Sequence, residues 1–370
     1  MKIPIIPRIT DKDLQLPIIK LSPSTFTRFR DGCVYQCILS KYIKNKVDSK
    51  SFEITFNLSN PSNLLGNIIH KLLELRVEGL IVTEQDFIEK WEELIRQKMT
   101  FIKEHFPTLK SIDLSDYDKM YKALDVAMSI QPNKLNNNEY PIINGFSIPK
   151  STELWIDGVD FIHGQIDRIL INDDSIEILD YKTGIVHDAL GNIKETYITQ
   201  LNLYALLFEK RFNRPVTKLT ILDFDGNRIN VPLFSGNFDK IFILVKELLM
   251  KVNKQIESMD WDNLSKPSLE NCKWCSCRTL CHYYWNSANQ SDSDFEGNVT
   301  TIINNDVLEM EDEHGNFTRI RGLRDYQIED FNTLKNRILR FHNIFSINNE
   351  MPWGRLFTTT KNTIIYEVIK

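Results

Sequence analysis

The sequence predicts an α/β or α+β fold, in which helices flank a mixed central sheet and a helical insertion precedes that sheet. Three observations support this fold class. Apolar residues recur at helical spacing through much of residues 60–135. Strand-like stretches bounded by turn residues follow between residues 151 and 183. Helical spacing returns in residues 197–212 and 237–258, so helices lie on both sides of the strands along the chain.

The helices ahead of the strands can be placed by capping residues and apolar spacing. After an irregular stretch over residues 1–20, capping serines open an expected helix over residues 22–43. Leucine and isoleucine pairs at helical spacing predict a second helix over residues 61–80. Amphipathic spacing predicts two more helices, over residues 84–106 and 114–130. The last three make up the helical insertion.

Composition and turn residues place the strands. Residues 151–161, 163–171 and 175–183 have strand composition and turn-like boundaries. Another hairpin is expected over residues 218–234, where an Asp-Gly-Asn turn separates two apolar stretches. These strands form the expected mixed sheet.

The elements predict a main domain over residues 1–285, followed by a stretch of linker composition over 286–297. Residues 298–370 mix strand, helix and strand, and we expect a small accessory region of unknown role. Aromatic and basic residues there are candidates for contact with DNA or a partner protein; a solvated accessory fold is the other interpretation. These candidates are Arg340, Phe341, Trp353 and Arg355.

Composition and charge exclude few functions. The chain has 370 residues and a formal net charge of -5, which neither indicates nor excludes a nucleic-acid partner, because basic patches act locally. The start lacks the pattern of a signal peptide, and no run of about 18 apolar residues exists. We therefore expect a soluble cytoplasmic protein. The chain contains no GxxxxGK[ST] sequence, so no nucleotide-driven motor is expected within it.

The six cysteines fall into two groups. Cys33 and Cys37 lie near the start, and four more lie within ten residues, at positions 272, 275, 277 and 281. In a reducing compartment such crowding favours metal binding over disulfides.

The stretch GQIDRILINDDSIEILDYKTG, residues 164–184, predicts a hairpin with two aspartates near its open end. If the turn is Asn172 to Ser175, antiparallel pairing puts Asp167 directly across from Asp180 and Gln165 across from Lys182. Like charges directly opposed on a sheet are destabilising. The pair is tolerated if a cation lies between the two carboxylates.

Two carboxylates offer the oxygen ligands that suit Mg²⁺ or Mn²⁺. Lys182 beside them could orient or help deprotonate an attacking water, which completes the parts for phosphodiester hydrolysis. The alternative is a surface hairpin with an ordinary Asp–Lys ion pair. A slip of one residue would put Asp167 and Asp180 on opposite faces.

The residues resemble the PD-(D/E)XK nucleases of the RecB type, in GQIDRI, then ILDYKTG, then QLNLY. The resemblance implies a restriction-endonuclease-like core. It makes Asp167, Asp180 and the backbone carbonyl of Tyr181 metal ligands, and Lys182 the catalytic lysine. The resemblance adds four further site residues. Gln200 and Tyr204 would face the site and the DNA strand, His70 of GNIIH would be a further metal ligand, and Glu153 is a weaker candidate.

The cysteine spacing resembles the iron–sulfur branch of this family, which includes AddB-type nucleases and CRISPR-associated adaptation exonucleases. That resemblance implies a [4Fe–4S] cluster on Cys33, Cys272, Cys275 and Cys281, with Cys277 as an alternative ligand and the cluster as a structural staple of the periphery. Zn²⁺ also accepts four thiolates and stays an alternative. Relatives usually carry proline after the first cysteine, where this chain has Val34.

The resemblance implies a Mg²⁺- or Mn²⁺-dependent deoxyribonuclease, an exonuclease on single-stranded DNA ends, in DNA repair and recombination or in defence against phage. Several iron–sulfur relatives act beside a helicase, so DNA and a helicase, or another repair or defence protein, are the expected partners. One alternative is a catalytically silent DNA-binding or scaffold module. The other is an endonuclease or a nuclease directed at RNA.

Overall fold

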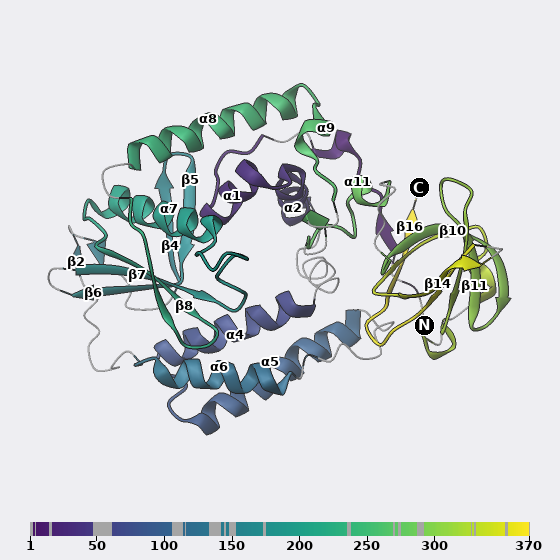
Figure 1. Ribbon diagram of the computed structural model, residues 1–370, viewed down its shortest axis with the longest axis horizontal. Coiled ribbons are helices and arrows are strands. Elements are labelled where there is room, and N and C mark those ends of the chain that lie inside the picture. The colour runs from purple at the N-terminus through teal and green to yellow at the C-terminus, as the bar shows by residue number, and fades with distance from the viewer. Residues whose placement is uncertain are drawn as a thin grey trace.

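The computed structural model describes residues 3, 5–14, 17–46, 61–105, 114, 116–132, 142–143, 146–147, 153–172, 175–234, 238–268, 271–272, 275–286, 292–326, 328, 331–351 and 354–369. The larger part of the chain surrounds a four-stranded mixed sheet (Figure 1). In that sheet β7 pairs antiparallel with β6 and parallel with β8, and β8 pairs antiparallel with β9. The predicted mixed sheet is therefore confirmed. Its strands are β6 (Arg168–Asn172), β7 (Ser175–Lys182), β8 (Lys218–Asp223) and β9 (Arg228–Val231).

Helices cover both faces of this sheet. Along β7, Ile176 and Ile178 belong to the apolar cluster shared with α7, while Leu179 and Tyr181 belong to the cluster shared with α4 and α6. Strand alternation therefore sends successive side chains of β7 into two different cores. The helices are α4 (Pro61–Val77), α5 (Glu84–His105), α6 (Tyr117–Ser129), α7 (Glu195–Phe212) and α8 (Phe238–Glu257). No helix in the described part of the chain is long and apolar enough to cross a membrane.

The helix expected over residues 22–43 is two helices, α1 (Pro23–Asp31) and α2 (Val34–Lys46). The Ser22 side chain caps α1 by accepting a hydrogen bond from a backbone N–H, as its position predicted. Gly32 ends α1, with its N–H donating to the Arg28 carbonyl. A Cβ at Gly32 would lie 3.1 Å from that carbonyl oxygen, so this close approach favours glycine.

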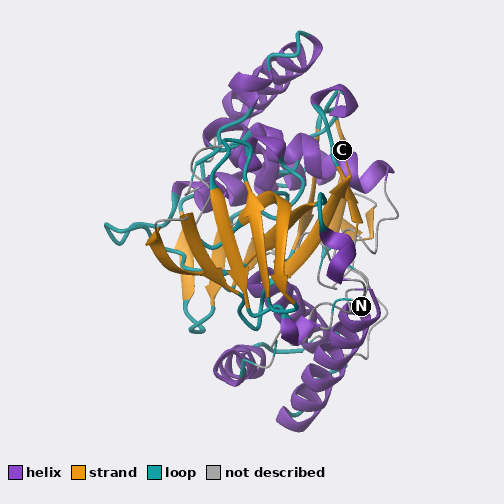
Figure 2. Cartoon of the chain, turned by 90° about the vertical axis from the view of Figure 1, so that its right-hand side faces the viewer, coloured by secondary structure: helices purple, strands orange, loops and turns teal. Residues whose placement is uncertain are grey.

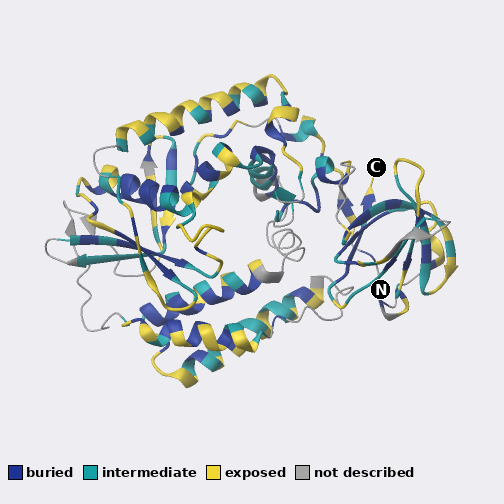
Figure 3. Cartoon of the chain, viewed as in Figure 1, coloured by how far each residue is buried: buried dark blue, intermediate teal, exposed yellow. Residues whose placement is uncertain are grey.

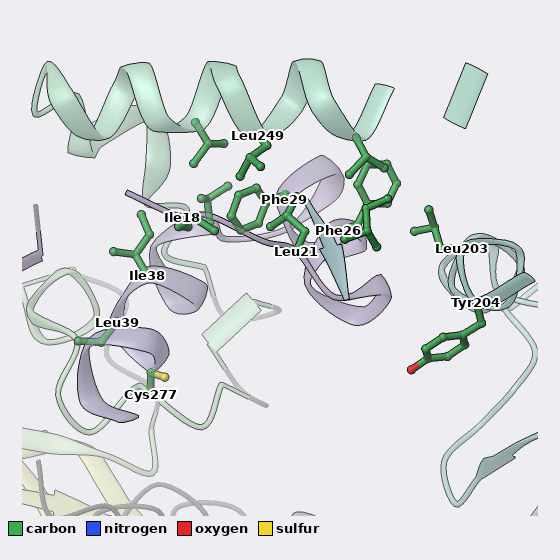
Figure 4. Close-up of a cluster of buried hydrophobic side chains, with 14 of the residues drawn as sticks. Ile18, Leu21, Phe26, Phe29, Ile38, Leu39, Leu203, Tyr204, Leu249 and Cys277 are labelled. Atoms are coloured by element: carbon green, nitrogen blue, oxygen red, sulfur yellow. The ribbon is translucent and has the colours of Figure 1, made fainter. Parts of the chain in front are cut away.

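The apolar cluster between α1, α2, α7 and α8 fixes the position of α7 (Figure 4). Phe26 and Phe29 of α1 pack there with Leu249 of α8, and Leu203 and Tyr204 come from α7. Figure 3 shows that α7 is buried along most of its length, whereas α8 keeps an exposed outer face. The helix that borders the candidate site is thus held on several sides.

A second, eight-stranded sheet contains the C-terminal region (Figure 2). Its order is β1-β16-β13-β10-β11-β12-β15-β14. The N-terminal strand β1 (Ile5–Pro7) pairs parallel with β16, so both ends of the chain contribute to it. The others are β10 (Phe295–Asn304), β11 (Val307–Glu311), β12 (Phe317–Arg321), β13 (Ile338–His342), β14 (Phe345–Met351), β15 (Gly354–Thr358) and β16 (Ile364–Ile369).

The remaining elements are short. Two are strand pairs, β2 (Ile142–Ile143) with β3 (Phe146–Ser147) and β4 (Leu154–Val159) with β5 (Ile162–Ile166). The others are α9 (Trp261–Leu264), α11 (His282–Trp285), η1 (Asp11–Leu14), η2 (Arg324–Tyr326) and η3 (Phe331–Leu334).

Two candidates for DNA contact in the C-terminal region are buried instead. Phe341 lies in the core of the second sheet, and Arg340 is 1% exposed. Arg340 bonds Glu296, donates to the Thr279 carbonyl at 2.6 Å and lies over the Trp285 ring. It therefore joins the cysteine-containing segment to the second sheet and does not face solvent. Arg355 pairs with an aspartate, and Trp353 lies outside the described residues.

Candidate active site

The hairpin register is the one expected from the sequence. Arg168 pairs with Leu179, and Ile171 pairs with Ile176, which places Asp167 at the end of the ladder next to Asp180. The chain breaks its strand at Asp167, because β5 and β6 join different sheets.

The predicted pairing of Gln165 with Lys182 is wrong. Gln165 pairs with Trp155 of β4, and Lys182 pairs with Asp223 of β8. The strand break at Asp167 is the reason, since it turns β5 out of the sheet that contains β7.

Asp167 is held by the backbone of the neighbouring strand. Its Oδ2 accepts a hydrogen bond from the Tyr181 N–H at 2.9 Å, and its side chain is 22% exposed. Burial raises the pKa of Asp167 to about 8, the negative charge of Asp180 adds to the rise, and Lys182 opposes it. Asp180 is therefore close enough for its negative charge to disfavour ionisation of Asp167.

Lys182 connects the two carboxylates to helix α7. Its Nζ lies 2.7 Å from Oδ2 of the buried Asp180 and donates to Oε1 of Gln200 at 3.2 Å. Burial lowers the pKa of Lys182, but the charges of Asp180 and Asp167 outweigh this and leave it raised. Lys182 is consequently an ammonium ion at neutral pH.

Helix α7 presents a polar stripe to Lys182. Gln200 Nε2 donates to the Tyr204 hydroxyl at 3.4 Å, and the Tyr197 ring lies with its centroid 4.9 Å from Lys182 Nζ. Sequence reasoning missed Tyr197. Its position was readable, because residues 197, 200 and 204 share one helix face at spacings of three and four.

Helix α7 approaches the β4–β5 hairpin closely at Gly164. A Cβ there would lie 3.0 Å from both Leu207 and Tyr204, closer than a side chain is normally accommodated. The missing side chain at Gly164 therefore sets how near Tyr204 comes to the sheet.

His70 reaches the site from helix α4 on the other face of the sheet. Its Nδ1 lies 4.0 Å from Asp167 Oδ2, and its ring meets the Tyr181 ring edge-on. Burial lowers the pKa of His70, and Asp180 only partly reverses this. The imidazole is therefore neutral at pH 7, which is the form that binds metals.

Glu153 lies at the edge of the same group. It adopts a φ of 65°, its N–H donates to the Asp167 carbonyl at 2.9 Å, and its carboxylate accepts from Gln165 at 2.8 Å. Burial raises the pKa of Glu153. Its backbone helps to hold Asp167, while its carboxylate is engaged with Gln165.

The donor set suits a hard divalent cation. Asp167, Asp180, the Tyr181 carbonyl and a neutral His70 are oxygen and nitrogen ligands of the types that Mg²⁺ and Mn²⁺ accept. As the described side chains stand, no three His, Cys, Asp or Glu groups converge closely enough to hold a metal ion. The raised pKa of Asp167 indicates that nearby positive charges do not fully compensate the negative charges of the site. A bound cation would supply the missing positive charge.

Five cysteines line one small cavity of about 20 Å³: Cys33, Cys272, Cys275, Cys277 and Cys281. Burial raises the pKa of Cys33, Cys272 and Cys281, whereas a hydrogen bond from Cys277 lowers that of Cys275. None of the six cysteines forms a disulfide. The residues predicted as iron–sulfur ligands are thus neighbours, and the cluster itself stays a prediction.

Comparisons with known proteins indicate the family of the chain. A sequence profile of the PD-(D/E)XK nuclease superfamily matches residues 20–282. An ATP-dependent helicase/nuclease subunit from Ligilactobacillus salivarius is 26% identical over 191 residues, which is 50% of this chain and 15% of that protein. The protein of the same name from Bacillus cytotoxicus is 33% identical over 76 residues, 18% of this chain and 6% of its own length. The match therefore covers a small part of either relative.

Among solved structures, a provisionally named exonuclease from Eubacterium rectale aligns with 76% of this chain and 92% of its own. The sequence identity is 12% and the TM-score 0.36. That score is too low to support a conclusion about fold or function.

Proposed function

The chain belongs to the PD-(D/E)XK nuclease superfamily, and from that premise we propose that it is a metal-dependent DNA nuclease, acting as an exonuclease on single-stranded ends. The observation that carries the proposal is the meeting of Asp167, Asp180 and Lys182 at the end of β7, with His70 on one side and Gln200 on the other. The similarity to helicase/nuclease proteins supports it.

In the proposed reaction Asp167, Asp180, His70 and the Tyr181 carbonyl would hold Mg²⁺ or Mn²⁺. When bound, such an ion would lower the pKa of a water molecule and stabilise negative charge on a phosphate. Lys182, as an ammonium ion, donates a hydrogen bond to the attacking water or to a phosphate oxygen.

The raised pKa of Lys182 argues against its acting as the base that takes the proton from the water. Gln200 and Tyr197 keep the Lys182 ammonium group in place, so they are positioning residues in this scheme.

The test is degradation of end-labelled linear single-stranded DNA with Mn²⁺, Mg²⁺ or EDTA, by wild type, Lys182→Ala and Lys246→Ala. Lys246 is an exposed lysine of α8 and serves as the matched control. We expect metal-dependent cutting that falls by about 100-fold or more in Lys182→Ala and is unchanged in the control. Equal cutting by all three proteins would show that Lys182 does not belong to the active site.

Circular single-stranded DNA, RNA and duplex DNA as parallel substrates test the exonuclease assignment. An exonuclease leaves the circle intact, whereas cutting of the circle identifies an endonuclease. No cutting by wild type, with DNA still bound, would favour the scaffold function. Since the relatives are named as helicase/nuclease proteins, we also propose that a helicase or another repair or defence protein acts with this chain on DNA.

We further propose that the cysteine cavity holds a structural [4Fe–4S] cluster, with Zn²⁺ as the alternative. The proximity of four partly buried thiols from opposite ends of the chain supports this. Protein purified without oxygen should carry iron and sulfide, with the visible absorbance of an iron–sulfur cluster, and Cys272→Ser should lose them. Cys37→Ser is the matched control, because Cys37 does not line the cavity. Zinc without iron would select the alternative.

A further inference from the structure

The C-terminal sheet has the strand connections of an OB-type barrel. Strands β10, β11 and β12 form an antiparallel meander, β12 pairs parallel with β15, and β15 pairs antiparallel with β14. The first half of β10 pairs with β13, which runs on into β14 after a bend at residues 343–344. The bent β13–β14 segment therefore closes the five-stranded barrel, because it pairs with both β10 and β15.

Among the described residues, apolar side chains fill the barrel interior. Phe295, Phe341, Phe357, Leu308 and Ile320 are among its fully buried side chains. The helical turn η3, between β12 and β13, adds Phe331 and Leu334 to the same core. A ligand of this barrel would have to bind on its outer surface.

One part of that outer surface leaves two phenylalanines in solvent. Phe345 of β14 is 63% exposed and Phe317 of β12 is 42% exposed. Both point outward, since their neighbours Ile344 and Thr318 are buried. Exposed rings of this size on a barrel whose core is complete are not needed for its packing.

Arginines lie between these rings. Arg321 pairs across the sheet with Thr358, which in turn pairs with Phe345, so Arg321 and Phe345 lie in one row two strand spacings apart. Arg319, one row along, pairs with Glu309 of β11 at 2.9 Å. Arg321 is exposed and makes no ion pair with any residue that the structure describes. The charged residues of β12 and β15 are all arginines, and β14 contains one glutamate, Glu350.

We propose that this outer face of β12, β15 and β14 binds single-stranded nucleic acid. Exposed rings give sequence-independent stacking platforms for unpaired bases, and arginine supplies charge for the phosphates. A duplex would not fit this chemistry, because its bases are already stacked on one another. In OB-type barrels the face of the second and third strands binds oligonucleotides; the proposed face shares the third strand, β12, with it and extends over β15 and β14 in place of β11. The site is distinct from the candidate active site, which lies on β7 and α7.

The experiment measures binding and not cleavage, so its result does not depend on the proposed nuclease activity. A fluorescently labelled single-stranded oligothymidylate is titrated with the full chain in EDTA. Phe345→Ala and Arg321→Ala are compared with wild type, and Tyr121→Ala and Arg96→Ala are controls for an exposed ring and an exposed arginine outside the barrel. Phe345→Trp restores a stacking ring.

We expect Phe345→Ala to weaken binding about fivefold or more, as the loss of one stacked base does. Arg321→Ala should weaken binding and reduce the slope of log affinity against log salt by about 1. Phe345→Trp and both controls should bind as wild type does. Affinity within twofold of wild type in both Phe345→Ala and Arg321→Ala, or no binding by wild type, would overturn the proposal.

Photocrosslinking gives a second measurement. A 4-thiothymidine oligonucleotide should crosslink to peptides that contain β12 or β14. Crosslinks confined to the β7 and α7 peptides would show that only the candidate active site binds the strand, which contradicts the proposal.

Discussion

Replacing Asp167 with asparagine should stabilise the metal-free protein. Partial burial and the nearby negative charge of Asp180 raise the pKa of the Asp167 carboxyl from 3.8 to about 8. Asparagine keeps an oxygen to accept the Tyr181 N–H and removes the negative charge. The substitution therefore removes a repulsion and leaves the hydrogen bond.

The sign follows from proton binding. Because the folded state binds the Asp167 proton more tightly than the unfolded state, unfolding free energy falls as pH rises from about 4 to 8. One pKa unit is worth about 1.4 kcal/mol, so half of the four-unit shift corresponds to about 3 kcal/mol at pH 8. Only half of the shift is converted into free energy, because water reaches the partly exposed Asp167 carboxylate and weakens the electrostatic effects on it.

Urea unfolding in EDTA at pH 5 and pH 8 measures this difference. We expect wild type to lose about 2 kcal/mol between the two pH values, because part of the total is already lost below pH 5, and Asp167→Asn to lose much less. Added Mn²⁺ should restore wild type at pH 8 and leave the variant unchanged, because the cation needs the carboxylate. If Asp167→Asn were the less stable protein at pH 8 in EDTA, the two carboxylates would not repel one another and the account of the site would fail.

Three further substitutions test the supports of the site. Gln200→Ala should slow DNA cleavage about tenfold with little change in stability, because the Lys182 ammonium group loses its hydrogen bond to Gln200. Initial cleavage rates and a thermal unfolding curve measure the two effects. Gly164→Ala should cost about 1–3 kcal/mol, since its methyl group would meet Leu207 and Tyr204. Gly184→Ala is the control for Gly164→Ala, because a Cβ at Gly184 meets no other atom. Equal urea midpoints for the two variants would show that Gly164 is not closely packed against α7. Arg340→Leu should lower unfolding free energy by about 1–3 kcal/mol, because it removes the bonds of Arg340 to Glu296 and to the Thr279 carbonyl while Glu296 keeps Arg8 as a partner; an unchanged urea midpoint would show that the junction does not depend on Arg340.

The sequence predicted most of the local structure around the site. Apolar spacing placed the insertion helices and α7 to within a few residues, because a helix that buries one face must repeat at its own period. The register of β6 with β7 followed from the assumed turn at Asn172–Ser175; a shift of one residue would have put Asp167 and Asp180 on opposite faces. The family resemblance implied that Gln200 and Tyr204 face the site.

Other features depended on the tertiary structure. Nothing local indicated that the strand breaks at Asp167, because the break arises from β5 joining β4 in a separate sheet. The raised pKa of Asp167 and the cationic state of Lys182 arise from burial and from neighbours on three different elements.

In the C-terminal barrel, too, the burial of individual residues depended on the tertiary structure. Arg340 and Phe341 have the composition of a DNA-contacting surface, and the fold buries both. Phe345, four residues further on, is left in solvent because it follows the bend that separates β13 from β14. By itself the sequence determined the helices, the hairpin and the residue types of the candidate site. Burial, charge compensation and the closure of the barrel were decided by the tertiary structure, because they depend on contacts between residues far apart in the chain.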